Sequence, residues 1–350
     1  MNASAMQNLS DNNSIIGEPW YGNQSGDTTD LVATICNQYI GPFLCVFGVF
    51  GNIMNLIILF KGNLNEPPYL YLKALAMTDM GALCFSLIYL TASNRSTLYE
   101  WKFYDAYIFF PIVNFFTATS VWLTVGVTID RFVYVKSPLW ARTQCSIYKA
   151  KTRITFILIS TTIITIPRFF CFILNGHDDK YHLQPTTFRS SKNYRIYDIT
   201  CIVLFHMAPL VIFISTNTYL IYAVHRARSV RREFNIRNNK EKDWNQEQRR
   251  FTITLISIVL LSIIAILPST IGDFTRLLHI PFADYNKLRH SSNVLLLCNL
   301  SMNFLLYCAF NKRFVRVLRS IFSGSYIRVK SSIRRASRTT RWSRSETNIL

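Results

Sequence analysis

Apolar residues are concentrated in seven long runs, which polar segments separate. The runs cover approximately residues 40–60, 70–90, 107–134, 154–174, 200–224, 251–274 and 293–310. A helix needs about 20 residues to cross a hydrocarbon core of roughly 30 Å, and most of these runs reach that length. Backbone amides in lipid must be hydrogen-bonded within their own segment. The pattern therefore predicts an all-α fold, a bundle of seven transmembrane helices whose last span is the shortest.

A shorter amphipathic pattern follows the last run, over residues 311–322. Apolar residues recur there at helical spacing, with arginines between them. The apolar positions are Phe314, Val317, Leu318, Ile321 and Phe322, and the arginines are Arg313, Arg316 and Arg319. We expect a helix lying on the anionic inner surface of the membrane. The chain then divides into a polar tail (1–35), the seven-helix domain (36–310), this surface helix (311–322) and a Ser- and Arg-rich tail (323–350).

Composition and charge agree with a membrane protein. Half of the residues are hydrophobic and 16% are charged, where a soluble domain has about 25% charged residues. The net charge of +19 comes from basic residues at the edges of the apolar runs and in the final tail. That placement favours contact with the membrane surface and excludes nucleic acid as the expected partner. The eight cysteines show no pair with the spacing of metal ligands.

The distribution of Lys and Arg predicts the orientation. The segments on the side of the C-terminus carry 26 basic residues, whereas those on the side of the N-terminus carry 9. Basic loops stay in the cytosol, so the N-terminus is expected outside the cell, in a multi-pass protein of the plasma membrane. Four Asn-X-Ser sequons in the N-terminal tail agree with this, and predict glycosylation at Asn2, Asn8, Asn12 and Asn23.

Several ionisable and amide side chains fall inside the apolar runs. Asp79 is in the middle of the second run, and Asp130 and Arg131 close the third. Because a charge near the bilayer centre is costly, such residues usually face the interior of the bundle. They can serve as hydrogen bonds between helices or as functional groups. For Asp79, a carboxylate among amide partners favours a cation or proton site.

Six short motifs resemble those of rhodopsin-like G-protein-coupled receptors. They are Gly51-Asn52, Leu75-Ala-Met-Thr-Asp79, Asp130-Arg131-Phe132, Pro209, Pro268 and Asn303-Phe-Leu-Leu-Tyr307. Within that family, residues 69–76, 166–170 and 303–310 are most similar to invertebrate FMRFamide-type peptide receptors. The resemblance implies a receptor that activates a heterotrimeric G protein when it binds an extracellular ligand, most simply a short amidated neuropeptide. It also implies arrestin and receptor kinases as partners, with Ser337 as a basic-directed phosphorylation site.

The resemblance also assigns roles to single residues. The expected ligand-binding residues are Phe110, Asn114, Tyr197, Asp198, Asp273 and Phe274. The expected activation residues are Asp130, Arg131, Pro268, Asn303 and Tyr307, and the expected sodium site consists of Asp79, Ser120, Asn299 and Asn303. A peptide ending in Arg-Phe-amide would need an aromatic slot and a carboxylate such as Asp273. Two alternatives stay open: the aromatic residues form a belt at the membrane interface, or Asp273 pairs with Arg276 inside the protein.

The sequence departs from the family pattern at informative positions. Ala106 stands where the family usually has a disulfide-bonded cysteine on the third helix, so that bridge cannot form. Asp130 is expected to hold Arg131 at rest, but Gln248 replaces the acid with which the sixth helix usually completes this lock. Val113 lacks the carboxylate of amine receptors, and no retinal-binding lysine is present in the seventh run.

Other classes of protein remain as alternatives. A small-molecule chemosensory receptor would have the same fold. A transporter or channel could also bury Asp79, but the odd number of spans and the lack of internal repeats disfavour both. No HExxH or GxSxG motif is present, so an enzyme is not expected, and no cofactor other than sodium is implied.

Overall fold

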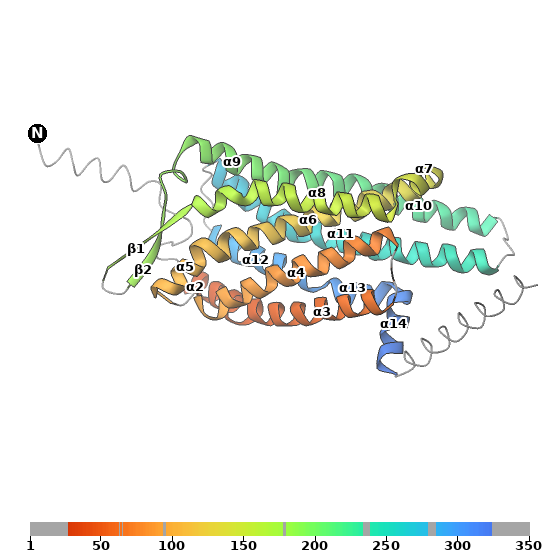
Figure 1. Cartoon of the computed structure of the whole chain (residues 1–350), viewed down its shortest axis with the longest axis horizontal. Helices are drawn as coiled ribbons and strands as arrows, with labels where there is room; N and C mark the ends of the chain where they lie inside the picture. Colours follow the sequence, from red (N-terminus) through yellow and green to blue (C-terminus); the bar gives the residue numbers. More distant parts are fainter. Residues whose placement is uncertain are drawn as a thin grey trace, which may run out of the picture.

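The computed structural model describes residues 27–62, 64, 66–93, 96–177, 180–233, 239–278 and 285–323. In this part of the chain long helices lie side by side and form one elongated bundle (Figure 1). Six helical segments are long and apolar enough to cross a membrane, and a bent pair provides a seventh. The predicted seven-helix bundle is therefore confirmed.

The helices follow the order of the predicted runs. The first span comprises α2 (Asp27–Thr34), the π-helical turn η2 (Ile35–Ile40) and α3 (Gly41–Lys61), and the second is α4 (Pro67–Thr91). The third comprises α5 (Tyr99–Phe103), η4 (Tyr104–Phe109) and α6 (Phe110–Lys136), and α7 (Pro138–Gln144) links it to the fourth, α8 (Ile147–Thr165) with η5 (Ile166–Phe170). The fifth comprises α9 (Lys192–Ile202), η6 (Val203–Met207) and α10 (Ala208–Glu233), and the sixth is α11 (Asn239–Leu277). The seventh comprises α12 (Tyr285–Ser301) and α13 (Asn303–Phe310), and α14 (Lys312–Phe322) follows it.

The seventh span is longer than its apolar run predicts. Its helix begins at Tyr285 rather than near residue 293, and it bends by 48° between α12 and α13. The extra turns contain Lys287, Arg289 and His290, which hydropathy places in a loop. Helical hydrogen bonding continues past the apolar stretch because the polar end of a membrane helix can lie in water or among headgroups.

A two-stranded hairpin follows the fourth span, whose helix ends at Phe170 although its apolar run extends to residue 174. Strands β1 (Phe172–His177) and β2 (Lys180–Pro185) are antiparallel, and Phe172 pairs with Pro185 at the open end. The Tyr181 amide donates to the Thr97 carbonyl (2.8 Å), which ties the hairpin to the segment before α5. We call the end of the bundle that carries β1 and β2 the hairpin end, and the opposite end the α14 end (Figure 1).

Small residues allow the first and seventh spans to approach closely. A side chain at Gly48 would come within 2.5 Å of the Ser301 hydroxyl. That hydroxyl donates to the Leu44 carbonyl (2.9 Å), and the Asn52 amide donates to the Leu300 carbonyl (3.0 Å). Close packing and hydrogen bonds are the main forces that hold helices together in lipid, where the hydrophobic effect is absent.

Helix α14 has the amphipathic character that the sequence predicts. The Asn311 side chain caps its first turn by accepting from the Phe314 amide (3.1 Å). Phe314 is buried and packs against the rings of Phe304 and Tyr307, with centroids 6.0 and 5.4 Å away. The apolar side of α14 thus continues the core at the α14 end.

Candidate functional site

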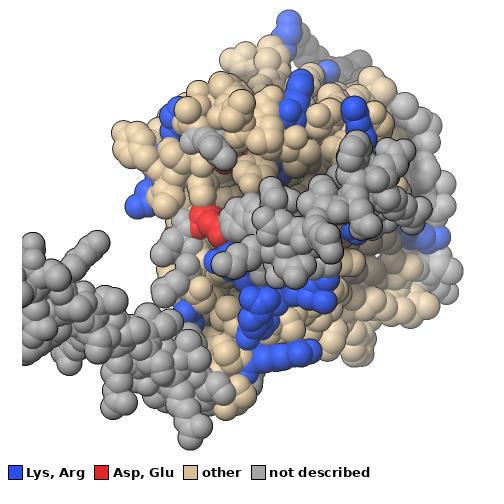
Figure 2. Space-filling model, turned by 90° about the vertical axis from the view of Figure 1, so that its right-hand side faces the viewer, with Lys and Arg blue, Asp and Glu red and all other residues tan. Residues whose placement is uncertain are grey.

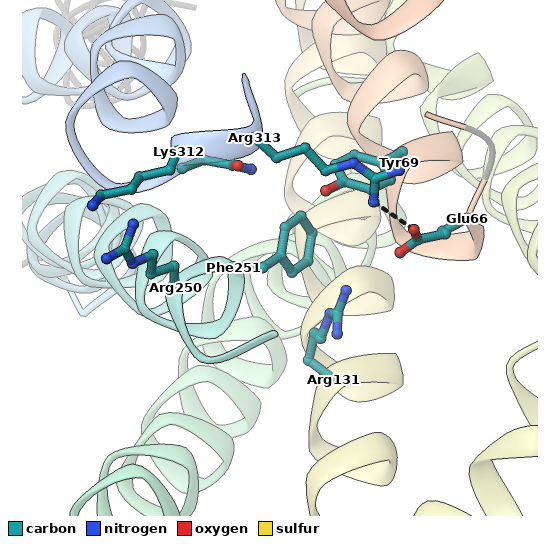
Figure 3. Close-up of a pocket in the computed structure, with 8 residues that line it drawn as sticks. Glu66, Tyr69, Arg131, Arg250, Phe251, Lys312 and Arg313 are labelled. Atoms are coloured by element: carbon teal, nitrogen blue, oxygen red, sulfur yellow. Dashed lines mark hydrogen bonds and ion pairs between the residues drawn. The ribbon is translucent and has the colours of Figure 1, made fainter. Parts of the chain in front are cut away.

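A pocket opens at the α14 end, where α4, α6, α11 and α14 meet (Figure 3). Its lining residues are Glu66, Tyr69, Arg131, Arg250, Phe251, Asn311, Lys312 and Arg313. Four of the eight are cations and one is an acid. Figure 2 shows this end of the molecule, and many Lys and Arg side chains are exposed on the part of it that the structure describes.

The predicted activation residue Arg131 lies in this pocket. Its guanidinium carbon is 4.0 Å from the centre of the Phe251 ring and 5.5 Å from that of Tyr134. Arg131 is on α6 and Phe251 is on α11, so this cation–π contact joins the third and sixth spans. Such a contact contributes about 0.5–2 kcal/mol, depending on how well water is excluded.

Asp130 has a partner that the sequence does not indicate. Its carboxylate forms an ion pair with Arg153 of α8, and the same guanidinium donates to the Gln144 carbonyl (2.8 Å). Cys145 lies beside this group, where its thiol contacts the Asp130 carbonyl oxygen (3.7 Å) and burial raises the pKa of the thiol. Asp130 therefore also joins the third and fourth spans, while its expected role of holding Arg131 stays a prediction.

An acid from the first loop at this end forms an ion pair with α14. Glu66 accepts from Arg313 of α14 (2.6 Å), as Figure 3 shows. Arg313 also lies over the Tyr69 ring (5.7 Å), and that ring meets Phe251 edge-on (5.1 Å). The pocket wall is therefore a continuous chain of contacts from α14 through α4 to α11.

Three of the four residues predicted for the sodium site meet in the middle of the bundle. The Asp79 carboxylate is completely buried, and it accepts from the Ser120 hydroxyl (2.5 Å) and the Asn303 amide (2.7 Å). Asn299 instead accepts from Ser262 of α11 (2.9 Å). The Asn303 side-chain oxygen is buried and has no hydrogen-bond partner among the described residues, so this polar centre holds an oxygen available to a cation.

The structure also places the predicted activation residues Tyr307 and Pro268. Tyr307 is buried at the α14 end beside Phe314, and Pro268 lies inside α11, which continues through it. The missing backbone donor of proline weakens the helix locally. This position suits a bend through which the two ends of α11 can move relative to one another.

The predicted ligand-binding residues form two groups at the hairpin end. Phe110 and Tyr197 lie together beside two arginines, Arg168 and Arg189. The Asn114 amide donates to the carbonyl of Phe110 (2.6 Å), within α6.

The second group lies between the fifth and sixth spans. The Asp273 carboxylate is 3.1 Å from the His206 ring nitrogen of η6. The side chain of Arg276, the alternative partner, lies outside the described residues, so that alternative stays open. Phe274 is 38% exposed. Asp198 lies on α9 and belongs instead to the first group, since it interacts with Arg168.

Sequence reasoning missed several polar groups at this end. Lys102 and Asp105 form a buried ion pair (3.0 Å), which Ser93 completes by donating to Asp105 (2.5 Å). Arg168 lies near the end of the fourth apolar run, within residues 166–170. A charged residue in such a position is a signal of function, so the sequence carries a signal for Arg168.

Hydrogen bonds close the two ends of the hairpin, and packing joins this region to the third span. All eight cysteines are free, and Ala106 packs in one buried cluster with Cys171. Thr186 follows β2, and its amide donates to the Cys171 carbonyl (3.0 Å) while its hydroxyl donates to the Phe170 carbonyl (2.7 Å).

Some predicted positions lie outside the described residues. These are the sequons at Asn2, Asn8, Asn12 and Asn23, the phosphorylation site Ser337 and the side chain of Gln248. They stay predictions.

Comparison with known proteins identifies the family. Residues 51–314 match the family model of the 7 transmembrane receptor (rhodopsin family). The chain belongs to this family of G-protein-coupled receptors.

Its relatives include receptors for peptides. The chain is 25% identical over 340 residues to the sex peptide receptor of Drosophila melanogaster, which covers 89% of this chain and 78% of that receptor. It is 27% identical over 297 residues to the FMRFamide receptor of the same fly, covering 79% of this chain and 52% of that receptor. A probable G-protein coupled receptor of Caenorhabditis elegans is 23% identical over 320 residues, 85% of this chain and 72% of the relative.

Proposed function

We propose that this receptor binds a short amidated peptide at its hairpin end and activates a heterotrimeric G protein at its α14 end. The hairpin end then faces the outside of the cell, and the N-terminus is extracellular in a plasma-membrane protein. The similarity to the sex peptide receptor and the FMRFamide receptor of the fly supports a peptide as the ligand. The excess of basic residues on the α14 side supports the orientation.

The observation that supports activation of a G protein is the pocket around Arg131. In the form of the pocket seen in the structure, which we call closed, the contact between Arg131 and Phe251 joins α6 to α11 (4.0 Å). Outward movement of the inner part of α11 breaks this contact and widens the pocket. Because the contact is worth only about 0.5–2 kcal/mol, the closed form is favoured modestly and some activity without ligand is expected.

We also propose that the cluster around Asp79 holds sodium in the resting receptor. The donor set suits a hard cation, since it offers a carboxylate, a hydroxyl and an amide oxygen. Sodium would supply a charge that neutralises the buried carboxylate. Asp79, Ser120 and Asn303 would hold it, and helices α4, α6 and α13 would thereby be kept together.

A nucleotide-exchange assay tests the proposed function. A library of amidated peptides is applied to cells that express the full chain, and exchange on the G protein is measured. Arg131→Ala should abolish exchange while peptide binding remains, because Arg131 is at the opposite end from the ligand. Arg226→Gln is the matched control, since it removes an exposed arginine of α10 and should leave exchange unchanged. Full exchange by Arg131→Ala would contradict the role of the pocket, and activation by small molecules alone would contradict the peptide.

A further inference from the structure

Two arginines share one aromatic surface at the hairpin end of the bundle. The guanidinium carbons of Arg168 and Arg189 lie 5.5 and 5.8 Å from the centre of the same Phe110 ring. Arg168 also lies 5.8 Å from the Tyr197 ring, and Arg189 lies 4.4 Å from the Phe172 ring. Both cations are therefore held among rings contributed by α6, α9 and β1.

Aromatic rings occupy the faces of a guanidinium and leave its edge free for hydrogen bonds. The N–H groups along that edge match the two oxygens of a carboxylate. The Nε of Arg168 is buried, and no hydrogen-bond partner for it is present in the described part of the chain. The neighbouring Tyr197 hydroxyl donates to the Ile164 carbonyl (2.9 Å). Arg168 thus has a buried donor whose acceptor is missing.

The two arginines concentrate positive charge on this surface, and Asp198 interacts electrostatically with Arg168. A buried donor that lacks an acceptor is costly. A ligand carboxylate would provide the acceptor that the Nε of Arg168 lacks among the described residues.

We propose that Arg168 and Arg189 form a carboxylate-binding subsite for the ligand, so that the receptor selects peptides with an acidic residue beside an aromatic one. The inference rests on the proposed function in that it places the ligand at the hairpin end. The proposal adds a preference of the two arginines for an acidic group of the ligand, whereas Asp273 suits a basic group. The peptide then spans the two groups, with its acid between α8 and α9 and its basic residue between the fifth and sixth spans.

Two matched peptide libraries test the proposal on the full-length receptor. Both contain amidated hexapeptides ending in Arg-Phe-amide; one has Asp or Glu at a variable position, and the other has Asn or Gln there. The best acidic peptide should be about 30-fold or more stronger than its amide counterpart, as expected when one partner of a buried charge pair is lost. Arg168→Gln and Arg189→Gln should remove this preference. Arg195→Gln, which changes an exposed arginine of α9, should keep it. Equal potency of the acid and amide peptides on the unmodified receptor would overturn the proposal without any variant.

A second measurement separates this proposal from the proposed function. The purified full-length receptor is heated with 4-hydroxyphenylacetate or with 4-hydroxyphenylacetamide, which differ in the carboxylate. The acid should raise the melting temperature of the unmodified receptor and of Arg195→Gln, but not of Arg168→Gln. If no library peptide activates the receptor and the acid still stabilises it in this pattern, the subsite stands and the peptide assignment fails. If the acid stabilises Arg168→Gln equally, it binds elsewhere and the subsite is refuted.

Discussion

Replacing Asp79 by asparagine separates the charge of the buried centre from its hydrogen bonds. Asp79 accepts from Ser120 (2.5 Å) and from Asn303 (2.7 Å), and it is 0% exposed. In Asp79→Asn the new amide oxygen can still accept from Ser120. The new amide nitrogen can donate to the Asn303 side-chain oxygen, which has no hydrogen-bond partner in the part of the unmodified protein that the structure describes. Two hydrogen bonds remain, both between neutral groups.

The magnitudes predict a small change in stability and a large change in sodium response. Hydrogen bonds to a charged group contribute about 1.5–3 kcal/mol and neutral ones about 0.5–1.5 kcal/mol, while side-chain hydrogen bonds within membranes average about 0.6 kcal/mol. Relief from burying a charge offsets part of this loss. We expect Asp79→Asn to change the free energy of unfolding by no more than about 1 kcal/mol. Sodium at about ten times its Kd would stabilise the unmodified receptor by about 1.4 kcal/mol, and Asp79→Asn should lose all of this.

Thermal unfolding of the purified receptor measures both quantities. Sodium chloride is compared with choline chloride at the same ionic strength, so that general screening is constant. The unmodified receptor should melt at a higher temperature in sodium, and Asp79→Asn should melt equally in both salts. Thr119→Val is the matched control: it removes the hydrogen bond with Thr161 (2.9 Å), a neutral bond between α6 and α8. It should lower stability and keep the sodium response.

Two results would refute this reasoning. An equal sodium shift in the unmodified receptor and in Asp79→Asn would show that the cation does not bind at this carboxylate. A large loss of stability by Asp79→Asn in choline would show that the exchanged amide does not recover the hydrogen bonds to Ser120 and Asn303.

Three further predictions concern the ends of the molecule. Glu66→Gln weakens a half-exposed ion pair with Arg313, worth about 0.2–1 kcal/mol, so ligand-independent nucleotide exchange should rise by up to about fivefold; unchanged basal exchange would show that this pair does not hold the pocket closed. Asp273→Asn should weaken an arginine-containing peptide by about 30-fold or more and its citrulline analogue little, and equal losses would make Asp273 structural. Truncation after Gly324 removes Ser337 and should slow agonist-driven internalisation if the tail recruits arrestin when phosphorylated; unchanged internalisation would exclude a phosphorylation switch in that segment.

The sequence could predict the features that depend on local composition. Transfer of an apolar segment into lipid depends on that segment alone, so the seven runs located the spans. The period of apolar residues over 311–322 located α14 for the same reason, as its amphipathic face needs no knowledge of its neighbours. A single carboxylate in an apolar run implied that Asp79 is buried, and its burial in the structure is complete.

Partner choice required the tertiary structure. Asp130 pairs with Arg153, and Arg313 pairs with Glu66, which is 247 positions away in the chain. Each pairing depends on which helix ends are neighbours and on their relative positions along the bundle, and the sequence of a single segment determines neither. The same holds for Arg168 and Arg189, which come from separate elements and meet only because both lie against Phe110.

Length and local hydropathy determined by themselves that this chain is a seven-helix membrane protein followed by an amphipathic helix. The hairpin, the bend at the seventh span and the ion pairs between separate elements were decided by the packed bundle. The physical reason is that hydrophobic insertion is summed over neighbouring residues, whereas a buried charge is stabilised only by the particular group that packing brings against it.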